Sequence, residues 1–502
     1  MAPLLVGRTD SRVFRGCINR LGARAPLRRK RRAQNQISGH FLTHHASGLA
    51  GALVFFMQAG FAMLEAGIVH PKNMTNILFK NICDASIAAI CFWLLGYGFA
   101  YGDSEGGFIG KTNFALQDIN NENGGWHSWF FQWAFTGACA TIVAGSVAER
   151  TTISAYFVYS VVLSSFIYPV VVHWGWGTGW LSAWGAVNGP IFTGTSESNG
   201  FVDFAGSGIV HMVGGFSGLM GAIVVGPRLG RFDPDTGKAV ELYSGNPSLQ
   251  ALGTFILWFG WYGFNCGSTL MMSAGAGALA GKVALNTTIS AAAATMTSVF
   301  LGYAIEGHWN IAMGLNGALA GLVGITAPCS VVNPWMALII GMVAAIVLHA
   351  GHYLLFWAKI DDPCDACVVH GFCGMWGCWA VGIFCTDENI RYAAYPNVNN
   401  ACGRAEQFGV QVVGSLVIMV WVIATAGLLF LAIKYTVGMR VDEETERVGL
   451  DRSEHGMFDE MLKINQAPVQ QIPMQAMPFP QQSVQYPQMS YGQPMMYTAP
   501  PQ

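Results

Sequence analysis

Long apolar stretches separated by polar loops fill the chain between residues 46 and 436. Eleven of them approach the length of about 20 residues that a helix needs to cross a membrane. We therefore predict an all-α polytopic membrane protein with eleven transmembrane helices. They are expected at residues 46–67, 77–100, 127–148, 153–175, 203–226, 249–271, 278–303, 308–327, 332–357, 365–386 and 407–434.

Composition supports this class. Of 502 residues, 52% are hydrophobic and only 11% are charged, whereas soluble domains carry about 25% charged residues. The 62 glycines suit helices that pack closely in a membrane. We expect the lipid bilayer, and no nucleic acid, as a partner; the net charge of −2 by itself indicates no partner.

The positions of Lys and Arg predict the orientation. With the N-terminus outside, the outer side carries few basic residues and the cytosolic side carries many, as membrane proteins prefer. We predict an N-out, C-in topology. The outer residues are Lys111, Lys282, Arg391 and Arg404; the cytosolic ones are Lys72, Lys80, Arg150, Arg228, Arg231, Lys238, Lys359, Lys434, Arg440, Arg447, Arg452 and Lys463.

The two ends of the chain differ from the predicted membrane domain at residues 46–436. Residues 1–45 form an Arg-rich extension that is similar in composition to an organellar transit peptide; the alternative is a dispensable extension. Residues 437–464 are polar and charged, and we interpret them as a cytosolic regulatory segment. Residues 465–502 are rich in Gln, Pro and Met and are expected to be disordered.

A short internal repeat indicates a duplication. "VHMVGGFSG" (210–218) and "VHGFCGMWG" (369–377) both place Gly four and seven residues after His. A five-plus-five repeat with one extra helix explains this match. Because five is odd, the second copy would be inverted in the membrane, with the site at the interface of the repeats.

The repeat draws attention to His211 and His370, which lie within apolar stretches where ionisable groups are costly and commonly functional. Two imidazoles in contact can share a proton; the alternative is that each binds a backbone carbonyl. Asp203, Asp362 and Asp365 each precede or begin a predicted helix and are interpreted as caps. Asp203 would also attract a cation.

Aromatic residues offer a second kind of site. Phe135 and Phe264 lie in predicted helices, and Trp176 lies at an outer end. A Trp face beside a hydroxyl, such as that of Ser268, can bind a small cation. The alternative for Trp176 is an ordinary aromatic belt at the membrane interface.

Two pairs of cysteines stand out. Cys385 and Cys402 share one polar loop and could form a disulfide if that loop is extracellular. Cys364 and Cys367, in "CDAC", resemble half of a metal site, but no second pair follows at a useful spacing. We expect no metal and no cofactor.

Longer motifs follow one another along the chain as "FQWAF", "VAGSVAER", "DFAGSGIVHMVGGFSGLMGAIVVGPR", "FGWYGFNCGS", "DDPCDACVVHGFCGMWG" and "GLDRSEHG". In sequence and in order they resemble the ammonium transporter (Amt/MEP/Rh) family, on the Amt branch and most like its plant-type members. The resemblance covers residues 50–456. Rh members lack the Trp and Ser of the outer site, which this chain has.

The resemblance implies a homotrimer in the plasma membrane with one pore per subunit. It implies an outer ammonium site at Trp176, Ser268 and Phe135, and a gate formed by Phe135 and Phe264. It also implies a proton relay by His211 and His370 and a requirement for Asp203. An organellar location is the alternative that the Arg-rich extension raises.

We expect an ammonium transporter rather than an enzyme. It would recruit NH4+ at the outer site, remove a proton and conduct NH3 through an apolar pore. The alternatives are an ammonium sensor and an electroneutral NH3 gas channel. Ser453 falls where plant-type members carry a phosphorylated Thr, which implies a kinase acting on the C-terminal tail.

Overall fold

The computed structural model describes residues 45–104, 106–120, 125–185, 192–195, 197–240, 242, 245–271, 275–398 and 402–457. The Arg-rich residues 1–44 and the Gln/Pro/Met-rich residues 465–502 lie outside this part of the chain. All elements described below belong to one compact unit that ends at Gly456.

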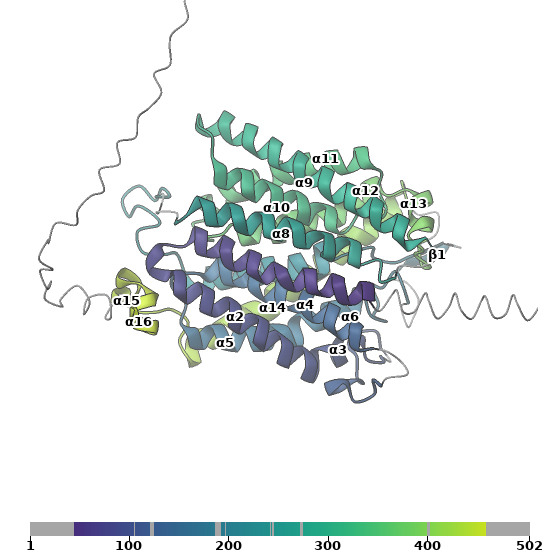
Figure 1. Ribbon diagram of the computed structural model, residues 1–502, viewed down its shortest axis with the longest axis horizontal. Helices are drawn as coiled ribbons and strands as arrows, with labels where there is room; N and C mark the ends of the chain where they lie inside the picture. Colours follow the sequence, from purple (N-terminus) through teal and green to yellow (C-terminus); the bar gives the residue numbers. More distant parts are fainter. Residues whose placement is uncertain are drawn as a thin grey trace, which may run out of the picture. The chain divides into compact units, whose positions relative to one another are not determined.

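Helices form nearly all of the described structure (Figure 1). Four of the described membrane-length segments contain a short π-helical stretch, namely η2, η4, η5 and η6, while η1 and η3 are short 3-10 helices. Eleven helical segments of the described chain approach membrane length. In chain order they are His45–Ile68; α2 (Met74–Cys91), η2 (Phe92–Gly96) and α3 (Tyr97–Tyr101); α4 (Trp126–Val147); α5 (Ile153–Val162), η4 (Leu163–Ile167) and α6 (Tyr168–Gly175); η5 (Ser207–Met212) and α7 (Val213–Val225); α8 (Pro247–Gly267); α9 (Ala276–Glu306); α10 (Ile311–Thr326); α11 (Pro334–Trp357); η6 (Cys367–Phe372) and α12 (Cys373–Phe384); and α14 (Ala405–Thr436).

Each of the eleven predicted stretches corresponds to one of these helical segments, so the fold class is confirmed. Nine helices in the described part are long and apolar enough to cross a membrane. The other two are α8, with 21 residues, and the shorter α10, with 16 residues.

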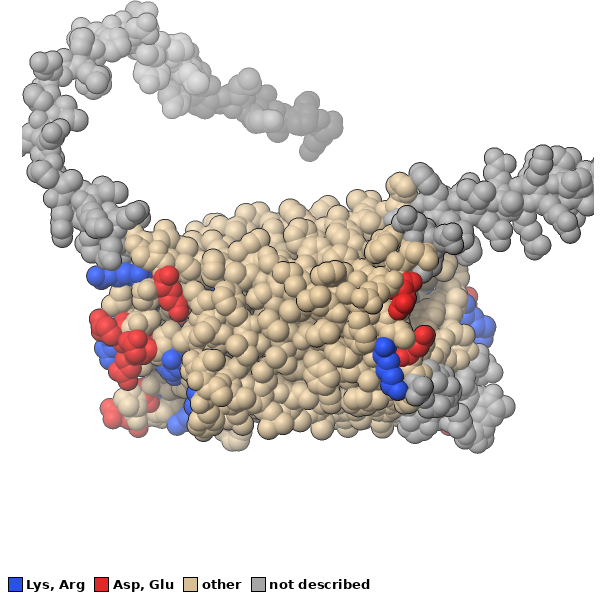
Figure 2. Space-filling model, turned by 90° about the horizontal axis from the view of Figure 1, so that it is seen from below, with Lys and Arg blue, Asp and Glu red and all other residues tan. Residues whose placement is uncertain are grey.

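The surface also fits a bilayer. On the face shown in Figure 2, acidic and basic side chains gather at the two ends, and the band between them carries almost none. Large apolar side chains are exposed on the helices, among them Leu428, Phe255 and Phe300. Apolar surface of this extent needs lipid or protein to cover it.

Short elements distinguish the two ends of the bundle. One end, here called the tail end, carries η1 (Pro71–Asn73), α15 (Glu443–Val448) and α16 (Leu450–His455). The opposite end, here called the pocket end, carries η3 (Phe114–Leu116), α13 (Asp387–Tyr392) and the antiparallel pair β1 (Phe192–Thr195) and β2 (Glu197–Asn199).

The structure corrects the position of one basic residue. Lys80 was assigned to a cytosolic loop, but it lies inside α2 and is only 2% exposed. Its ammonium group donates a hydrogen bond to the carbonyl oxygen of Thr151, 2.8 Å away, just beyond the end of α4. The length of the lysine side chain lets a residue inside the helix reach a polar partner at the tail end.

The two repeats meet at their π-helical segments. Both η5 and η6 have six residues, and each contains one of the two predicted histidines. They pack against each other, while α7 packs against η6 and α12 packs against η5. A π-helical segment inside an α-helix is uncommon and frequently marks a functional site.

Candidate functional site

A cavity of about 650 Å³ opens at the pocket end, and Trp176, Ser268 and Phe135 are among its lining residues. The indole N–H of Trp176 donates to the carbonyl oxygen of Asp203 at 2.7 Å, which fixes the ring. The hydroxyl of Ser268 donates to the carbonyl oxygen of Phe264 at 2.8 Å. The lone pairs of the Ser268 oxygen therefore remain available to accept a hydrogen bond.

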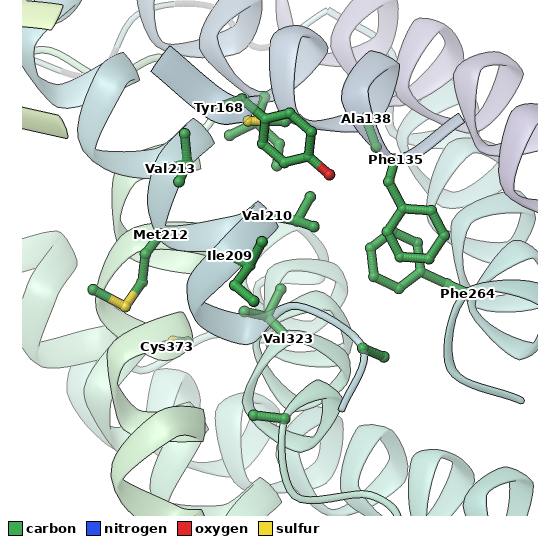
Figure 3. Close-up of a cluster of buried hydrophobic side chains, with 14 of the residues drawn as sticks. Phe135, Ala138, Tyr168, Ile209, Val210, Met212, Val213, Phe264, Val323 and Cys373 are labelled. Carbon is green, nitrogen blue, oxygen red and sulfur yellow. The ribbon is translucent and has the colours of Figure 1, made fainter. Parts of the chain in front are cut away.

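Phe135 lines this cavity, and its ring stacks on that of Phe264 behind it. The ring centroids of Phe135, from α4, and Phe264, from α8, are 4.0 Å apart with an interplanar angle of 27°, and both side chains are fully buried. Figure 3 shows the two rings face to face beside a cluster of other buried side chains. The edge of one ring meets Trp176, since Phe135 and Trp176 are 5.8 Å apart at 81°.

The two histidines lie behind these rings. Nδ1 of His370 and Nδ1 of His211 are 3.1 Å apart, so one imidazole donates a hydrogen bond to the other. The His211 ring also stacks near Phe264, at 5.3 Å, and on Trp261, at 5.1 Å. His173 represents the alternative arrangement, because its Nδ1 lies 3.0 Å from the carbonyl oxygen of Ala100.

A cluster of buried apolar side chains lies beside the two rings (Figure 3). The residues labelled in Figure 3 come from several helices and are almost all hydrocarbon or sulfur, with the hydroxyl of Tyr168 as the exception. All of them are buried. An unpaired ion has no compensating partner in such apolar surroundings, whereas a small neutral molecule needs none. The labelled residues are Phe135, Ala138, Tyr168, Ile209, Val210, Met212, Val213, Phe264, Val323 and Cys373.

Asp203 acts as a helix cap. Its Oδ1 accepts hydrogen bonds from the backbone N–H groups of Gly206 and Ser207 at 2.9 and 2.8 Å. Its Oδ2 accepts from Gly208 and Ile209 at 2.9 and 2.8 Å. Four N–H groups at the start of η5 thus converge on one carboxylate, and its negative charge is well compensated.

Asp362 and Asp365, which were predicted to share one role, have different roles. Oδ2 of Asp362 accepts from the backbone N–H of Cys367 at 2.7 Å and so caps η6, but Oδ1 has no partner in the described structure. Burial, reinforced by the charge of Asp365, raises the pKa of Asp362 to about 6.

The expectation that Asp365 caps a helix is wrong. Its carboxylate binds Nδ1 of His352 at 2.8 Å and Nδ2 of Asn316 at 3.2 Å. A positive φ of 52° at Asp365 accompanies this arrangement, in which the side chain joins α10 and α11 instead of the helix that follows.

The cysteines fall into two groups. Cys385 and Cys402 form a disulfide at the pocket end, with their Cα atoms 5.4 Å apart. Cys364 and Cys367 are buried free thiols.

At the tail end, charged residues from the quoted motifs form a cluster whose role the sequence did not reveal. The guanidinium of Arg228 binds Asp361 at 2.8 Å and also pairs with Glu149, while Arg150 donates to the backbone oxygen of Asp361 at 2.7 Å. Burial tends to raise the pKa of Asp361, but hydrogen bonds and the charge of Arg228 outweigh it and hold this pKa below its usual value.

The regulatory segment contacts its own chain beside this cluster. The carboxylate of Asp451 accepts from the backbone N–H groups of Thr75 and Asn76 at 2.9 and 2.8 Å and caps α2. The ammonium group of Lys72 donates to the carbonyl oxygens of Glu446 and Arg447 at 2.8 and 2.7 Å. Ser453 is exposed on α16.

Sequence reasoning missed the burial of three charged residues inside the bundle. Glu65, Lys80 and Asp84 are 3%, 2% and 0% exposed. Asp84 accepts hydrogen bonds from the hydroxyls of Tyr156 and, at 2.8 Å, Ser160. The signal was present, because these are charged residues inside predicted apolar stretches.

Comparison with known proteins places this geometry in a family. The sequence profile described as Ammonium Transporter Family matches residues 47–460. The chain is 43% identical over 410 residues to ammonium transporter 1 member 1 of Arabidopsis thaliana, covering 79% of this chain and 81% of that one. It is 40% identical over 409 residues to ammonium transporter Amt2 of Archaeoglobus fulgidus, covering 81% of this chain and 86% of that one.

Solved structures agree with the sequence matches. A protein described as a sensor Amt protein superposes with a TM-score of 0.74 at 33% identity, over 84% of this chain and 99% of that one. The crystal structure of Mep2 from Candida albicans superposes with a TM-score of 0.71 at 27% identity, over 80% of this chain and 87% of that one.

Proposed function

The chain belongs to the ammonium transporter family, and we propose that it moves ammonium across the plasma membrane as NH3 and a separately transferred proton. One observation carries this mechanism: the cavity, the stacked pair Phe135–Phe264 and the contacting pair His211–His370 follow one another into the protein. Each part suits one step of the transfer.

The cavity suits recruitment of NH4+. The face of Trp176 attracts a cation through its π electrons, and the free lone pairs of Ser268 accept one N–H. Phe135 closes the same space from below. These contacts favour a small cation that carries hydrogen-bond donors.

The apolar lining suits selection by deprotonation. Potassium is close to ammonium in size, so a pore wide enough for one ion would admit the other. Burying either ion without partners costs tens of kcal/mol by simple Born solvation. Ammonium alone can shed a proton and cross as NH3, while the histidine pair holds NH3 by hydrogen bonds and relays the proton.

In this proposal the pocket end faces outward and the tail end faces the cytosol, because basic residues are concentrated at the tail end. Three chains form a homotrimer with one pore in each subunit. No chemical turnover of ammonium is required beyond reversible transfer of a proton. A kinase acting on Ser453 is the proposed regulatory partner.

A second candidate is an ammonium sensor that signals through its C-terminal region. The likeness to the sensor Amt protein and the contacts of α15 and α16 with the bundle favour it. Removal of residues 458–502 separates the two functions, because a transporter keeps its ammonium current without them.

The test is growth of yeast that lacks its own ammonium uptake, paired with current recording from cells that express this chain. We expect growth on low ammonium and an inward current with ammonium but not with K⁺. Growth without current would indicate an electroneutral NH3 channel. Failure of both, with the protein present at the cell surface, would refute transport.

A further inference from the structure

One buried carboxylate has no part in the mechanism above. Glu65 lies near the tail end of the helix His45–Ile68 and is 3% exposed. One turn before it, the ring of Phe61 lies 6.2 Å from the ring of His370. At 1.5 Å of rise per residue, Glu65 lies about 6 Å further along the helix axis, toward the tail end. Carboxylates inside membrane helices are rare and are commonly functional.

The two oxygens of this carboxylate differ. Oε2 accepts a hydrogen bond from Nδ2 of Asn81 at 2.7 Å, and in the described structure no hydrogen bond reaches Oε1. Opposite Oε1, α4 has Gly145: a Cβ there would lie 3.4 Å from Oε1 and 2.9 Å from Cβ of Cys364. The glycine therefore leaves space beside the free oxygen, where the segment that leads into η6 passes.

The charged side chains near Glu65 differ from it because their polar atoms have hydrogen-bond partners. Asp84 has both oxygens occupied, by Tyr156 and Ser160, and Lys80 donates to a backbone carbonyl. Both are in α2 and interact electrostatically with Glu65, while Gly145 of α4 adds no charge and Cys364 adds a buried thiol. Glu65 therefore retains an oxygen that can take up a proton.

We propose that Glu65 exchanges protons with the histidine pair and the substrate at the cytosolic side of the pore. The proposal rests on the proposed function, in which NH3 and a proton arrive separately at this side. The proton leaves His370 and binds the carboxylate, which becomes a carboxylic acid. That acid then gives the proton to NH3, so that NH4+ and the carboxylate form again.

Position and chemistry support this role together. NH3 that has passed the histidines must regain a proton before it leaves as ammonium, and a carboxylic acid can supply it. In this proposal hydrogen-bonded water carries the proton between the histidine pair and the Glu65 carboxylate. The bond from Asn81 holds the side chain in place while Oε1 stays free.

The test substitutes Glu65→Gln, which keeps an oxygen for Asn81 but cannot carry the proton. We measure current and uptake of ¹⁵N-labelled ammonium in the same cells, at surface levels matched by labelling. The charge moved per nitrogen taken up should fall at least tenfold. Glu406→Gln, the same change at an exposed position near the start of α14, is the matched control and should behave like wild type.

The outcomes separate this proposal from the proposed function. If wild type carries neither current nor labelled ammonium, the proposed function fails. If wild type transports and Glu65→Gln keeps the wild-type ratio of charge to nitrogen, the role of Glu65 is overturned even when uptake falls, because a merely structural residue lowers both together.

A second variant decides the matter if Glu65→Gln does not reach the surface or takes up no ammonium. Glu65→Asp keeps a carboxyl group that can carry the proton, but its side chain is one methylene group shorter. We expect a several-fold lower ratio of charge to nitrogen at an unchanged surface level. A ratio equal to that of wild type would overturn the proposal.

Discussion

The two π-helical segments at the centre of the bundle invite comparison, because each follows an aspartate and contains a histidine eight residues beyond it. Asp203 precedes His211 and Asp362 precedes His370. The carboxylate of Asp203 accepts four backbone N–H groups with both oxygens. Asp362 has one such bond to Cys367 at Oδ2 and leaves Oδ1 without a partner in the described structure.

The two histidines also differ, in their burial and in the rings that they contact. His211 is fully buried and stacks on Trp261 and Phe264. His370 is 4% exposed and approaches Phe61, on the helix that carries Glu65. The two copies thus share a similar local backbone but differ in their neighbours: His211 packs against two aromatic rings, whereas His370 approaches the helix that carries Glu65. The repeat places the two histidines at matching positions, and the side chains around each histidine make their surroundings different.

The sharpest test of the comparison replaces each histidine in turn. His211→Ala and His370→Ala both remove the contact between the rings, so we expect each variant to lose ammonium transport or its selectivity over K⁺. Because His370 is the less enclosed of the two side chains, its loss should also admit K⁺ current more readily. Currents with ammonium and with K⁺ check this; wild-type flux and selectivity in both variants would refute the relay.

The next test compares the caps. Asp203→Asn leaves one acceptor oxygen for four N–H groups and turns an NH2 group toward two of them. Since each unsatisfied buried group costs about 1–3 kcal/mol, we expect a loss of about 2–6 kcal/mol. Thermal unfolding of the purified protein in detergent measures this loss, with Asp362→Asn as the matched control.

Asp362→Asn should cost far less, because the amide oxygen can still accept from Cys367. The pKa of Asp362, raised to about 6 from 3.8, adds a pH dependence with a definite sign. A raised pKa means that stability is gained as pH falls through about 6 and is lost as pH rises through it. Wild type should therefore gain stability relative to Asp362→Asn between pH 7 and 5; an equal response in both would contradict the assignment.

Much of this architecture could be predicted from the sequence because the bilayer imposes simple rules. Length and hydropathy located all eleven helices, and the repeat around His211 and His370 identified the residues that meet at the centre. Trp176 and Ser268 were assigned through the resemblance to a family, and they do line one cavity. In each of these cases a local pattern was enough.

The remaining features depend on partners that are distant in the sequence. Asp365 looks like a cap from its position before a helix, but His352 and Asn316 lie close enough to bind it. The role proposed for Glu65 depends on Asn81 and on a glycine in α4. No pattern along the chain predicted the π-helical segments, which form where two helices cross closely.

A smaller effect is expected at the cavity that Trp176 and Ser268 line. Trp176→Leu removes the cation–π face, worth about 0.5–2 kcal/mol, so the apparent affinity should fall about 2- to 30-fold. Ser268→Ala removes the acceptor hydroxyl and should add to this. Current measured against ammonium concentration checks both. Neither side chain lies at the histidines, so unchanged K⁺ exclusion is the control, and an unchanged affinity in the double variant would refute the outer site.

The last comparison concerns the helix that follows the first helix of each repeat. The N-terminus of α2 is capped by Asp451 of the regulatory segment, whereas the N-terminus of α9, at Gly275, has no side-chain cap in the described structure. The two repeats therefore differ at this helix start, because residues of the C-terminal segment cap α2 and no side chain caps α9 in the described structure. Any charge added to this segment should therefore act at the N-terminus of α2.

Ser453→Asp tests this asymmetry. Ser453 is exposed, and its hydroxyl donates to the carbonyl oxygen of Gly449 at 3.1 Å. Asp451 and Glu454 already occupy the donors at the start of α2, so a further negative charge meets repulsion instead of free N–H groups. We expect transport to fall several-fold, while Ser453→Ala stays active.

Co-expression sharpens this prediction, because in the proposed trimer it tests whether the change acts on one subunit or on all three. If release in one subunit closes all three pores, uptake in cells expressing wild type and Ser453→Asp should fall below the fraction of wild-type subunits. Surface labelling of both forms provides the control. Uptake that merely tracks the mutant fraction would limit the effect to the subunit carrying the change. The contacts of Asp451 with α2 would then regulate only the pore of their own chain.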